Sequence, residues 1–264
     1  MPLDFSKISA ASNSDTLDNP REIFSALPSK DPKYKYLRDV QAEVLDQWHT
    51  RRSSRNLRLK MNTGAGKTLI GLLILKSCLN EGKGPAVYVA PTPYLASQVI
   101  AEGRALGIAV DDDPRATSVL RGKSILVTYI HVLLNGRSKF GVGDEGVKLP
   151  IGSLILDDAH ACLATSEQQF TLTVESSHEV YDDIFDLFRT DLEAQSSVSV
   201  LDIEEREPHK FMLVPFWAWY DKIKQVETLL HKHREDEGFL FVWPLLRDHL
   251  RLCRRRRIGR RRPR

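Results

Sequence analysis

The sequence predicts an α/β fold in which helices cover both faces of a parallel sheet, followed by a mainly helical C-terminal region. Two observations predict it. Short, continuously apolar runs alternate with stretches of helical periodicity as far as residue 163, and strands of parallel sheets are apolar throughout because both of their faces are buried. After residue 163 the alternation fades and helical patterns dominate, which indicates a second region built mostly from helices.

Four apolar runs predict the strands of the sheet: 57–61, 86–90, 124–128 and 153–156. Helical spacing or longer apolar stretches predict the helices that cover it: 37–48, 69–79, 94–106 and 130–134. Ligands of such sheets bind at the carboxyl ends of the strands. A binding site is therefore expected where the strands end.

The C-terminal region is predicted to hold helices over 178–192, 217–233 and 239–252, with short strands at 170–174 and 211–214. An aromatic cluster in this region is predicted to be core, although such rings could also stack on bases: Phe211, Phe216, Trp217, Trp219 and Tyr220.

The composition is that of a globular protein with a sizeable core. The chain has 264 residues, of which 42% are hydrophobic and 28% are charged, so neither a disordered nor a fibrous protein is expected. Its longest apolar runs fall well short of the roughly 20 residues that a membrane-spanning helix needs. The three cysteines are far apart, and the N-terminus lacks the apolar core of a signal peptide. We therefore expect a cytoplasmic protein with no membrane partner and no zinc site.

We divide the chain into four segments. The first, residues 1–33, is expected to be a mobile leader with one short helix, in which Asn19 is the N-cap and Pro20 the first helical residue. The others are the α/β domain over 34–163, the mainly helical region over 164–250, and an arginine-rich tail over 251–264.

The tail dominates the charge of the chain. The net charge is +3, yet the tail alone holds nine arginines and no acid, so the rest of the chain is net acidic and a basic nucleic-acid surface would have to be local. Two interpretations of the tail stay open: a basic arm that contacts nucleic acid, and the truncated or out-of-frame end of an interrupted domain.

A glycine-rich loop, TGAGKT over residues 63–68, lies between the first predicted strand and the helix after it. A phosphate chain needs backbone amides that converge from a loop too tight for side chains, which Gly64 and Gly66 allow, and a cation, which Lys67 supplies. The hydroxyl of Thr68 suits magnesium, and the helix N-terminus favours anions. The strand before the loop and the helix after it favour this site over an ordinary glycine turn.

A second polar motif, DDAH, follows the apolar run 153–156. Beside a phosphate loop, Asp157 would hold the metal through water, and Asp158 would orient or deprotonate the attacking water. Without such a loop, two aspartates at this place would be a helix cap. His160 would be an ordinary surface histidine outside this motif.

These motifs resemble a known family. TGAGKT and DDAH, about ninety residues apart, resemble motifs I and II of the superfamily 2 helicases, the DEAD/DEAH-box group. APTPYLASQ (residues 90–98) resembles their motif Ia, VTYIHVLLNG (127–136) falls where motif Ib belongs, and LRDVQ (37–41) resembles their upstream glutamine motif. The resemblance covers about residues 34–163.

The resemblance implies a RecA-like, ATP-binding motor domain that couples ATP hydrolysis to movement on DNA or RNA. It implies nucleotide contacts from Gln41, on adenine, and from Thr63, Gly64, Ala65, Gly66, Lys67 and Thr68, on the phosphates. It implies Mg²⁺ contacts from Thr68 and Asp157, catalytic roles for Lys67, Asp157, Asp158 and His160, and nucleic-acid contacts from Thr92 and Thr128.

The chain departs from the family pattern in three ways. Met61 stands where the general loop pattern has glycine, and Asp158 stands where family members usually have glutamate. Aspartate is one methylene shorter than glutamate. Asp158 would therefore act through another water, or ATP hydrolysis would be slow. Nothing after residue 163 resembles the later family motifs, so the resemblance implies a first domain, apparently truncated, whose partner would be a second motor domain that carries the arginine finger.

Two other functions stay open. One is a P-loop ATPase or kinase that does not act on nucleic acid. The threonine of PTP and the histidine of DDAH argue against this function. The other is a non-catalytic fragment that binds ATP or a partner. Stimulation of ATPase activity by DNA or RNA would separate the first from a helicase.

Overall fold

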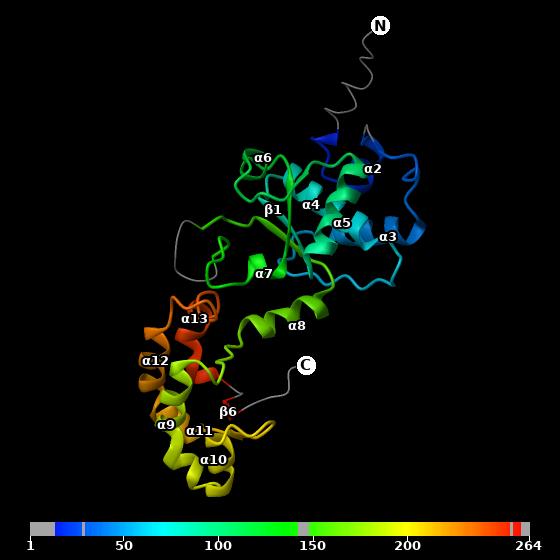
Figure 1. Ribbon diagram of the computed structural model, residues 1–264. Coiled ribbons are helices and arrows are strands. Elements are labelled where there is room, and N and C mark those ends of the chain that lie inside the picture. The colour runs from blue at the N-terminus through cyan, green and yellow to red at the C-terminus, as the bar shows by residue number, and fades with distance from the viewer. Residues whose placement is uncertain (1–13, 28–29, 142–147, 254–255, 260–264) are drawn as a thin grey trace, which may run out of the picture. The chain divides into compact units, whose positions relative to one another are not determined.

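The computed structural model describes residues 14–27, 30–141, 148–253 and 256–259. The chain forms two compact units: unit 1 comprises Met1–Leu134, Lys139–Gly141 and Val147–Ser166, and unit 2 comprises Asn135–Ser138, Val142–Gly146 and Glu167–Arg264. Figure 1 shows the elements of each unit. Of the leader predicted over residues 1–33, residues 1–13 and 28–29 lie outside the described residues.

Unit 1 is built around a four-stranded parallel sheet in the order β2-β3-β1-β4. The strands are β1 (Ala86–Ala90), β2 (Val110–Asp111), β3 (Ile125–Tyr129) and β4 (Ser153–Leu156). In the centre, Tyr88 of β1 pairs with Val127 of β3 on one side and Ile155 of β4 on the other. The parallel sheet and its helices confirm the predicted α/β class.

One predicted strand is wrong. Residues 57–61 form no strand, and Leu57 and Leu59 are 40% and 45% exposed. In this run Leu57, Leu59 and Met61 alternate with the charged Arg58 and Lys60, so only one face of a strand would be apolar. A strand in the middle of a parallel sheet needs two apolar faces.

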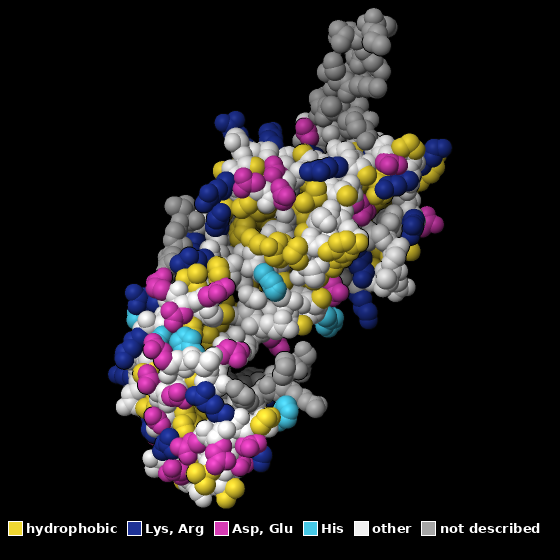
Figure 2. Space-filling view, in the orientation of Figure 1, with side chains coloured by type: hydrophobic (Ala, Val, Ile, Leu, Met, Phe, Trp, Pro, Cys, Tyr) yellow, Lys and Arg dark blue, Asp and Glu magenta, His cyan; other side chains and the backbone are white. Residues whose placement is uncertain are grey.

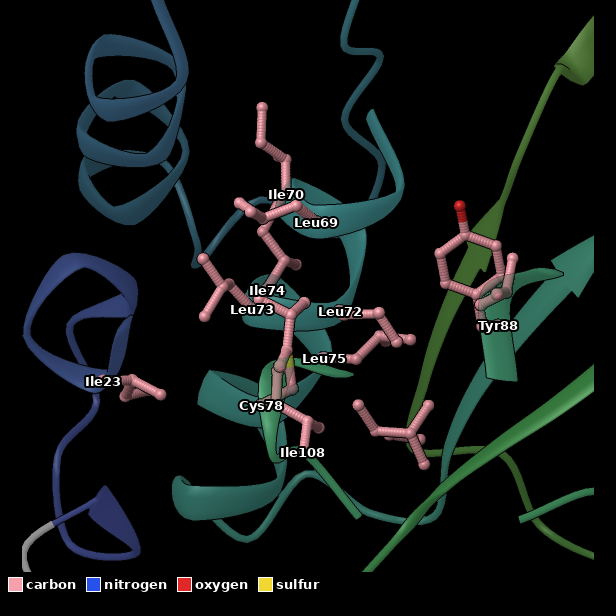
Figure 3. Packing of buried hydrophobic residues seen from close by; sticks show 14 of the residues in the cluster. Ile23, Leu69, Ile70, Leu72, Leu73, Ile74, Leu75, Cys78, Tyr88 and Ile108 are labelled. Atoms are coloured by element: carbon pink, nitrogen blue, oxygen red, sulfur yellow. The ribbon is translucent and has the colours of Figure 1, made fainter. Parts of the chain in front are cut away.

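One face of the sheet is covered by α4 (Lys67–Asn80) and α5 (Pro93–Leu106), and α2 (Pro20–Ala26) and α3 (Asp39–Thr50) pack on α4 as a further layer of the same core. Ala86, Tyr88 and Ala90 of β1 point to this face because alternate residues of a strand share a side. Figure 3 shows how the aliphatic side chains of α4 fill the layer between α2 and the sheet. The asparagine cap of α2 forms as predicted, since the Asn19 side chain accepts from the amide of Arg21.

The other face of the sheet carries a smaller core. Val87 and Val89 of β1 and Leu126 of β3 lie on it. The helices that contribute to this core are α6 (Thr117–Leu120), α7 (Ile130–Leu133) and α8 (Ala159–Gln169). Helices therefore lie on both faces of the sheet, as predicted.

Unit 2 is mainly helical and has its own core. Its elements are α9 (Glu179–Glu193), α10 (Ser197–Glu204), α11 (Phe216–Asp221), α12 (Ile223–Lys232), α13 (Trp243–Leu246), the 3-10 helix η1 (Arg247–Leu252), and an antiparallel pair of β5 (Phe211–Leu213) and β6 (Arg257–Gly259). The predicted helix 217–233 is interrupted at Lys222, the predicted helix 239–252 is divided into shorter turns, and no strand forms at 170–174. Nowhere in the described ranges is a helix long and apolar enough to cross a membrane.

The predicted aromatic core is wrong for most of its members. Phe211, Phe216, Trp217 and Tyr220 are 46%, 58%, 68% and 49% exposed. Only Trp219 packs inward, with its ring stacked on Phe188 at 5.8 Å between centroids. Helix α11 has six residues and turns one face to the core, so the remaining rings project outward.

Candidate nucleotide-binding site

The glycine loop leads into α4 through two left-handed residues. Gly64 and Gly66 have φ of +77° and +81°, a region that side chains other than glycine's rarely adopt. A Cβ on Gly66 would also come within 2.3 Å of Gln41 Nε2. Gly66 is the N-cap of α4 and Lys67 its first residue, and no carboxylate in the described part of the chain pairs with the Lys67 ammonium. The helix N-terminus and a free cation thus lie side by side, as an anion site requires.

Helix α3 holds this loop in place. Gln41 is buried, and its Nε2 donates to the carbonyl of Ala65 at 2.9 Å while its Oε1 accepts from the amide of Arg38 at 3.0 Å. Arg38 Nη1 donates to the carbonyl of Gly64 at 2.9 Å. The adenine contact of Gln41 stays a prediction, and the structure shows that this residue also fixes the loop backbone.

The two aspartates follow β4 at its carboxyl end. The amide of Asp157 donates to the carbonyl of Val89 at 2.9 Å, which continues the ladder of the sheet. Asp157 Oδ1 accepts from the amide of Asp158 at 3.0 Å. Asp158 has a φ of +42° and its Oδ1 accepts from the amide of Ala161 at 3.3 Å, so its carboxylate caps α8.

Tyr88 connects the loop to the aspartates, and sequence analysis missed it. Its side chain is 1% exposed, and its hydroxyl lies close enough to the carboxylate of Asp157 and the hydroxyl of Thr68 to interact with both. Figure 3 shows that hydroxyl pointing past Leu72 toward the end of α4 where Leu69 lies. Burial, with the charge of Asp157 adding to it, raises the pKa of Tyr88, so the hydroxyl keeps its proton.

Gly71 makes room for the Tyr88 ring. A Cβ at this position would lie 2.7 Å from Tyr88 Cε2, closer than van der Waals contact allows. Glycine in a helix interior costs about 1 kcal/mol relative to alanine. A glycine in the apolar helix and a tyrosine in the apolar run AVYVA were therefore the signals that could have revealed this contact.

A further carboxyl group lies close to Asp157. Glu102 of α5 is half-buried, and burial raises its pKa, with the charge of Asp157 acting in the same direction and Lys33 against it. Carboxyl groups perturbed in this way are frequent at functional sites. Glu102 thus joins the polar cluster at the carboxyl ends of the strands.

The predicted nucleic-acid and catalytic residues outside this cluster lie as follows. Thr92 is exposed and caps α5, with Oγ1 accepting from the amide of Leu95 at 3.3 Å. Thr128 lies in β3 opposite Val89 and is 7% exposed. His160 is exposed in the first turn of α8. Their contacts with nucleic acid or nucleotide stay predictions.

A histidine cluster in unit 2 has the composition of a metal site. Nitrogens of His178 and His233 and an oxygen of Asp236 lie within 4.8 Å of one another. However, His178 Nδ1 accepts from the amide of Val180, so in the neutral ring Nε2 carries the proton and donates it to Asp236 Oδ2 at 3.1 Å. A metal would need that nitrogen deprotonated. We assign the cluster as a hydrogen-bonded cap of α9.

Comparison with known protein families identifies one match. The model of the DEAD/DEAH box helicase family matches residues 38–184, more than half of the chain. The matched stretch contains every residue of the candidate site. Searches among curated proteins and among solved structures found no match.

Proposed function

The chain belongs to the DEAD/DEAH box helicase family, and on that premise we propose that unit 1 is the ATP-binding motor domain of a helicase or translocase that acts on nucleic acid. The observation that carries the proposal is the glycine loop before α4, joined to Asp157 through Thr68 and Tyr88. A loop alone could bind any anion. Together with a strand-end carboxylate it suits a nucleoside triphosphate and its metal.

The loop binds the phosphates through its backbone. The left-handed conformation at Gly64 and Gly66 lets successive amides converge on one anion, and Lys67 adds a positive charge at the start of α4. Because Gln41 and Arg38 hydrogen-bond to carbonyls of the same loop, the amides are oriented before the nucleotide arrives.

The residues beside the loop fit a magnesium ion. Mg²⁺ prefers oxygen ligands such as hydroxyls and carboxylates, which Thr68 and Asp157 offer. A carboxylate only accepts hydrogen bonds, so we propose that the Tyr88 hydroxyl donates to Asp157 and that its oxygen accepts the Thr68 proton. That proton then points away from the cation, and the lone pairs of Thr68 Oγ1 are left for it. When bound, Mg²⁺ supplies positive charge against the charge on the phosphates.

We propose that Asp158 orients the attacking water and that hydrolysis is completed by a second motor domain that supplies an arginine finger. An arginine finger is worth about 10³ to 10⁵ in rate in phosphoryl transfer. We propose Thr92 and Thr128 as contacts for the backbone of DNA or RNA, since both lie near the strand ends that carry Asp157.

A second candidate function, nucleotide binding with little or no turnover, is favoured by one observation. The carboxylate of Asp158 already accepts from the amide of Ala161, and aspartate is shorter than the glutamate of most family members. Catalysis therefore needs this carboxylate to leave the cap of α8 or to act through a further water.

Calorimetry of the full chain with Mg²⁺-ATP tests the proposal. Lys67→Ala should weaken nucleotide binding by tenfold or more, because it removes the cation that faces the phosphates. Lys123→Ala, which removes an exposed lysine from the turn before β3, is the matched control and should leave the affinity unchanged. Equal affinity of Lys67→Ala and the parent would refute nucleotide binding at this loop. ATP hydrolysis stimulated by DNA or RNA would favour a motor domain over the second candidate.

A further inference from the structure

Unit 2 exposes a group of aromatic rings beside arginines. We call it the aromatic–arginine surface and define it by its members: Phe211, Phe216, Trp217, Tyr220, Arg251, Arg256 and Arg257. All four rings are between 46% and 68% exposed. Large apolar side chains gathered at one place on a surface mark interaction sites more often than single exposed ones do.

Each arginine of this surface lies over a ring. The guanidinium carbon of Arg257 is 4.8 Å from the centroid of Phe211, that of Arg251 is 5.5 Å from Tyr220, and that of Arg256 is 5.7 Å from Phe216. Within the described residues, none of these guanidiniums forms an ion pair with a carboxylate. Arg251 and Arg257 are exposed, so their charge is available to an anionic partner, whereas Arg256 is half-buried and its Nη1 donates to the carbonyl of Cys253.

The backbone that carries this surface is anchored by side chains buried in the core of unit 2. Met212 of β5 pairs with Ile258 of β6, and both point inward, 8% and 5% exposed. Their neighbours Phe211 and Arg257 therefore face outward, since successive residues of a strand alternate. Part of the arginine-rich tail is thus a strand with a buried isoleucine.

Helix α11 is anchored in the same way. Trp219 stacks on Phe188, and its indole nitrogen donates to the carbonyl of Leu250 at 2.9 Å. This fixes the face of α11 from which Phe216 and Tyr220 project, with 6.1 Å between their centroids. By contrast, Figure 2 shows acidic side chains gathered over α9 and α10, which would repel an anionic partner.

We propose that the aromatic–arginine surface binds single-stranded nucleic acid. Such a strand offers base faces that stack on aromatic rings and one phosphate per nucleotide for the guanidiniums. In a duplex the base faces are stacked and inaccessible, and an acidic peptide has negative charge but no bases. Neither partner would therefore stack on the four rings. The surface lies outside residues 38–184 matched by the helicase family, and its binding does not rest on the nucleotide function of unit 1.

Fluorescence anisotropy with a labelled oligothymidine of about 12 nucleotides, a length within the known range of single-strand sites, tests this with the full chain in the absence of ATP. The double variant Arg251→Gln/Arg257→Gln should bind more weakly and lower the log–log salt slope by about 1.4, because each phosphate contact on a single strand contributes about 0.7. Arg234→Gln is the control for the removal of an arginine from unit 2 and should change neither quantity.

The rings are tested separately. Trp217→Ala and Phe216→Ala should each weaken binding by about fivefold or more without changing the salt slope, while Trp217→Tyr should keep most of the affinity because a ring remains. Phe170→Ala, which removes another exposed ring of unit 2, should have no effect. Thermal unfolding of each variant shows whether unit 2 stays folded.

Three results would overturn the proposal. One is a parent chain that does not bind the oligonucleotide, or surface variants that bind it as the parent does. Another is a duplex that binds equally well with no effect of the ring variants, which would indicate general phosphate binding. The third is displacement of the labelled oligonucleotide by polyglutamate as effectively, per negative charge, as by unlabelled oligonucleotide, which would indicate an acidic protein partner. Lys67→Ala, which disables the nucleotide site alone, should bind the oligonucleotide normally, so failure of either proposal can be told from failure of the other.

Discussion

Removing the hydroxyl of Tyr88 should weaken the binding of Mg²⁺ with nucleotide more than the binding of nucleotide alone. In Tyr88→Phe the ring stays between α4 and the sheet, while Thr68 and Asp157 lose the neighbouring hydroxyl that we propose orients them. Asp157 Oδ1 then still accepts a hydrogen bond from the amide of Asp158 at 3.0 Å. Neither residue that would hold the metal is removed, but neither is held in one orientation.

The size of the effect follows from the two side chains that lie beside this hydroxyl, Thr68 and Asp157. Loss of a group that orients a metal ligand typically lowers metal affinity by about 10 to 100-fold, and here one hydroxyl orients two. We therefore expect the Mg²⁺ concentration for half-maximal effect to rise by at least tenfold, or about 1.4 kcal/mol. It is read from Mg²⁺ titrations with a fluorescent ATP analogue. Affinity without Mg²⁺ should stay constant, because Lys67 and the loop amides are intact.

A matched control removes a hydroxyl elsewhere in unit 1. Tyr36 is 82% exposed, so Tyr36→Phe should leave the Mg²⁺ titration unchanged. In an Asp157→Asn background, Tyr88→Phe should have much less effect, since the two residues act together. An unchanged Mg²⁺ midpoint in Tyr88→Phe, or an equal loss of affinity with and without Mg²⁺, would show that this hydroxyl only supports packing.

Two further predictions concern stability. Gly71→Ala should lower the free energy of unfolding by about 1 kcal/mol or more in urea titrations, because overpacking against the Tyr88 ring costs about 1 to 3 kcal/mol and outweighs the better helix propensity of alanine; a more stable variant would show that the ring moves freely. In the parent, the free energy of unfolding should fall as pH rises through the titration of Glu102, and in Glu102→Gln this fall should be absent. Because the pKa of Glu102 is raised in the folded chain, the unfolded chain loses its proton first, and stability falls from the ordinary glutamate pKa of about 4.3 up to the folded value. Equal slopes of stability against pH in both proteins would contradict this.

The sheet of unit 1 could be predicted to the extent that burial alone decides it. Runs such as 86–90 are apolar on both faces, and this pattern has one stable arrangement in a parallel sheet. The run 57–61 has strand-like alternation, yet Arg58 and Lys60 leave it a single apolar face. Whether such a segment pairs depends on a neighbouring strand that local sequence does not reveal.

The site could be predicted where a motif carries the chemistry. The phosphate loop needs glycines and a lysine at fixed spacing, so residues 63–68 could be identified directly. Tyr88 could not, because its place in an apolar run indicates only a buried strand residue. In unit 2, the aromatic residues of α11 were predicted to be core since aromatic side chains are usually buried, and a helix of six residues offers too little periodicity to show which rings face outward.

Tyr88 and Gly71 make the packing of α4 part of the metal site. A buried hydroxyl without a partner costs about 1 to 3 kcal/mol, so a tyrosine in the central strand is stable only if polar groups meet its oxygen. Thr68 and Asp157 are the polar groups beside it, and the ring reaches them only because Gly71 has no side chain. Any movement of α4 relative to β1 therefore changes the distance between Thr68 and Asp157 through this ring. The core contact that positions α4 is thus also the contact that sets the geometry of the two residues expected to hold Mg²⁺.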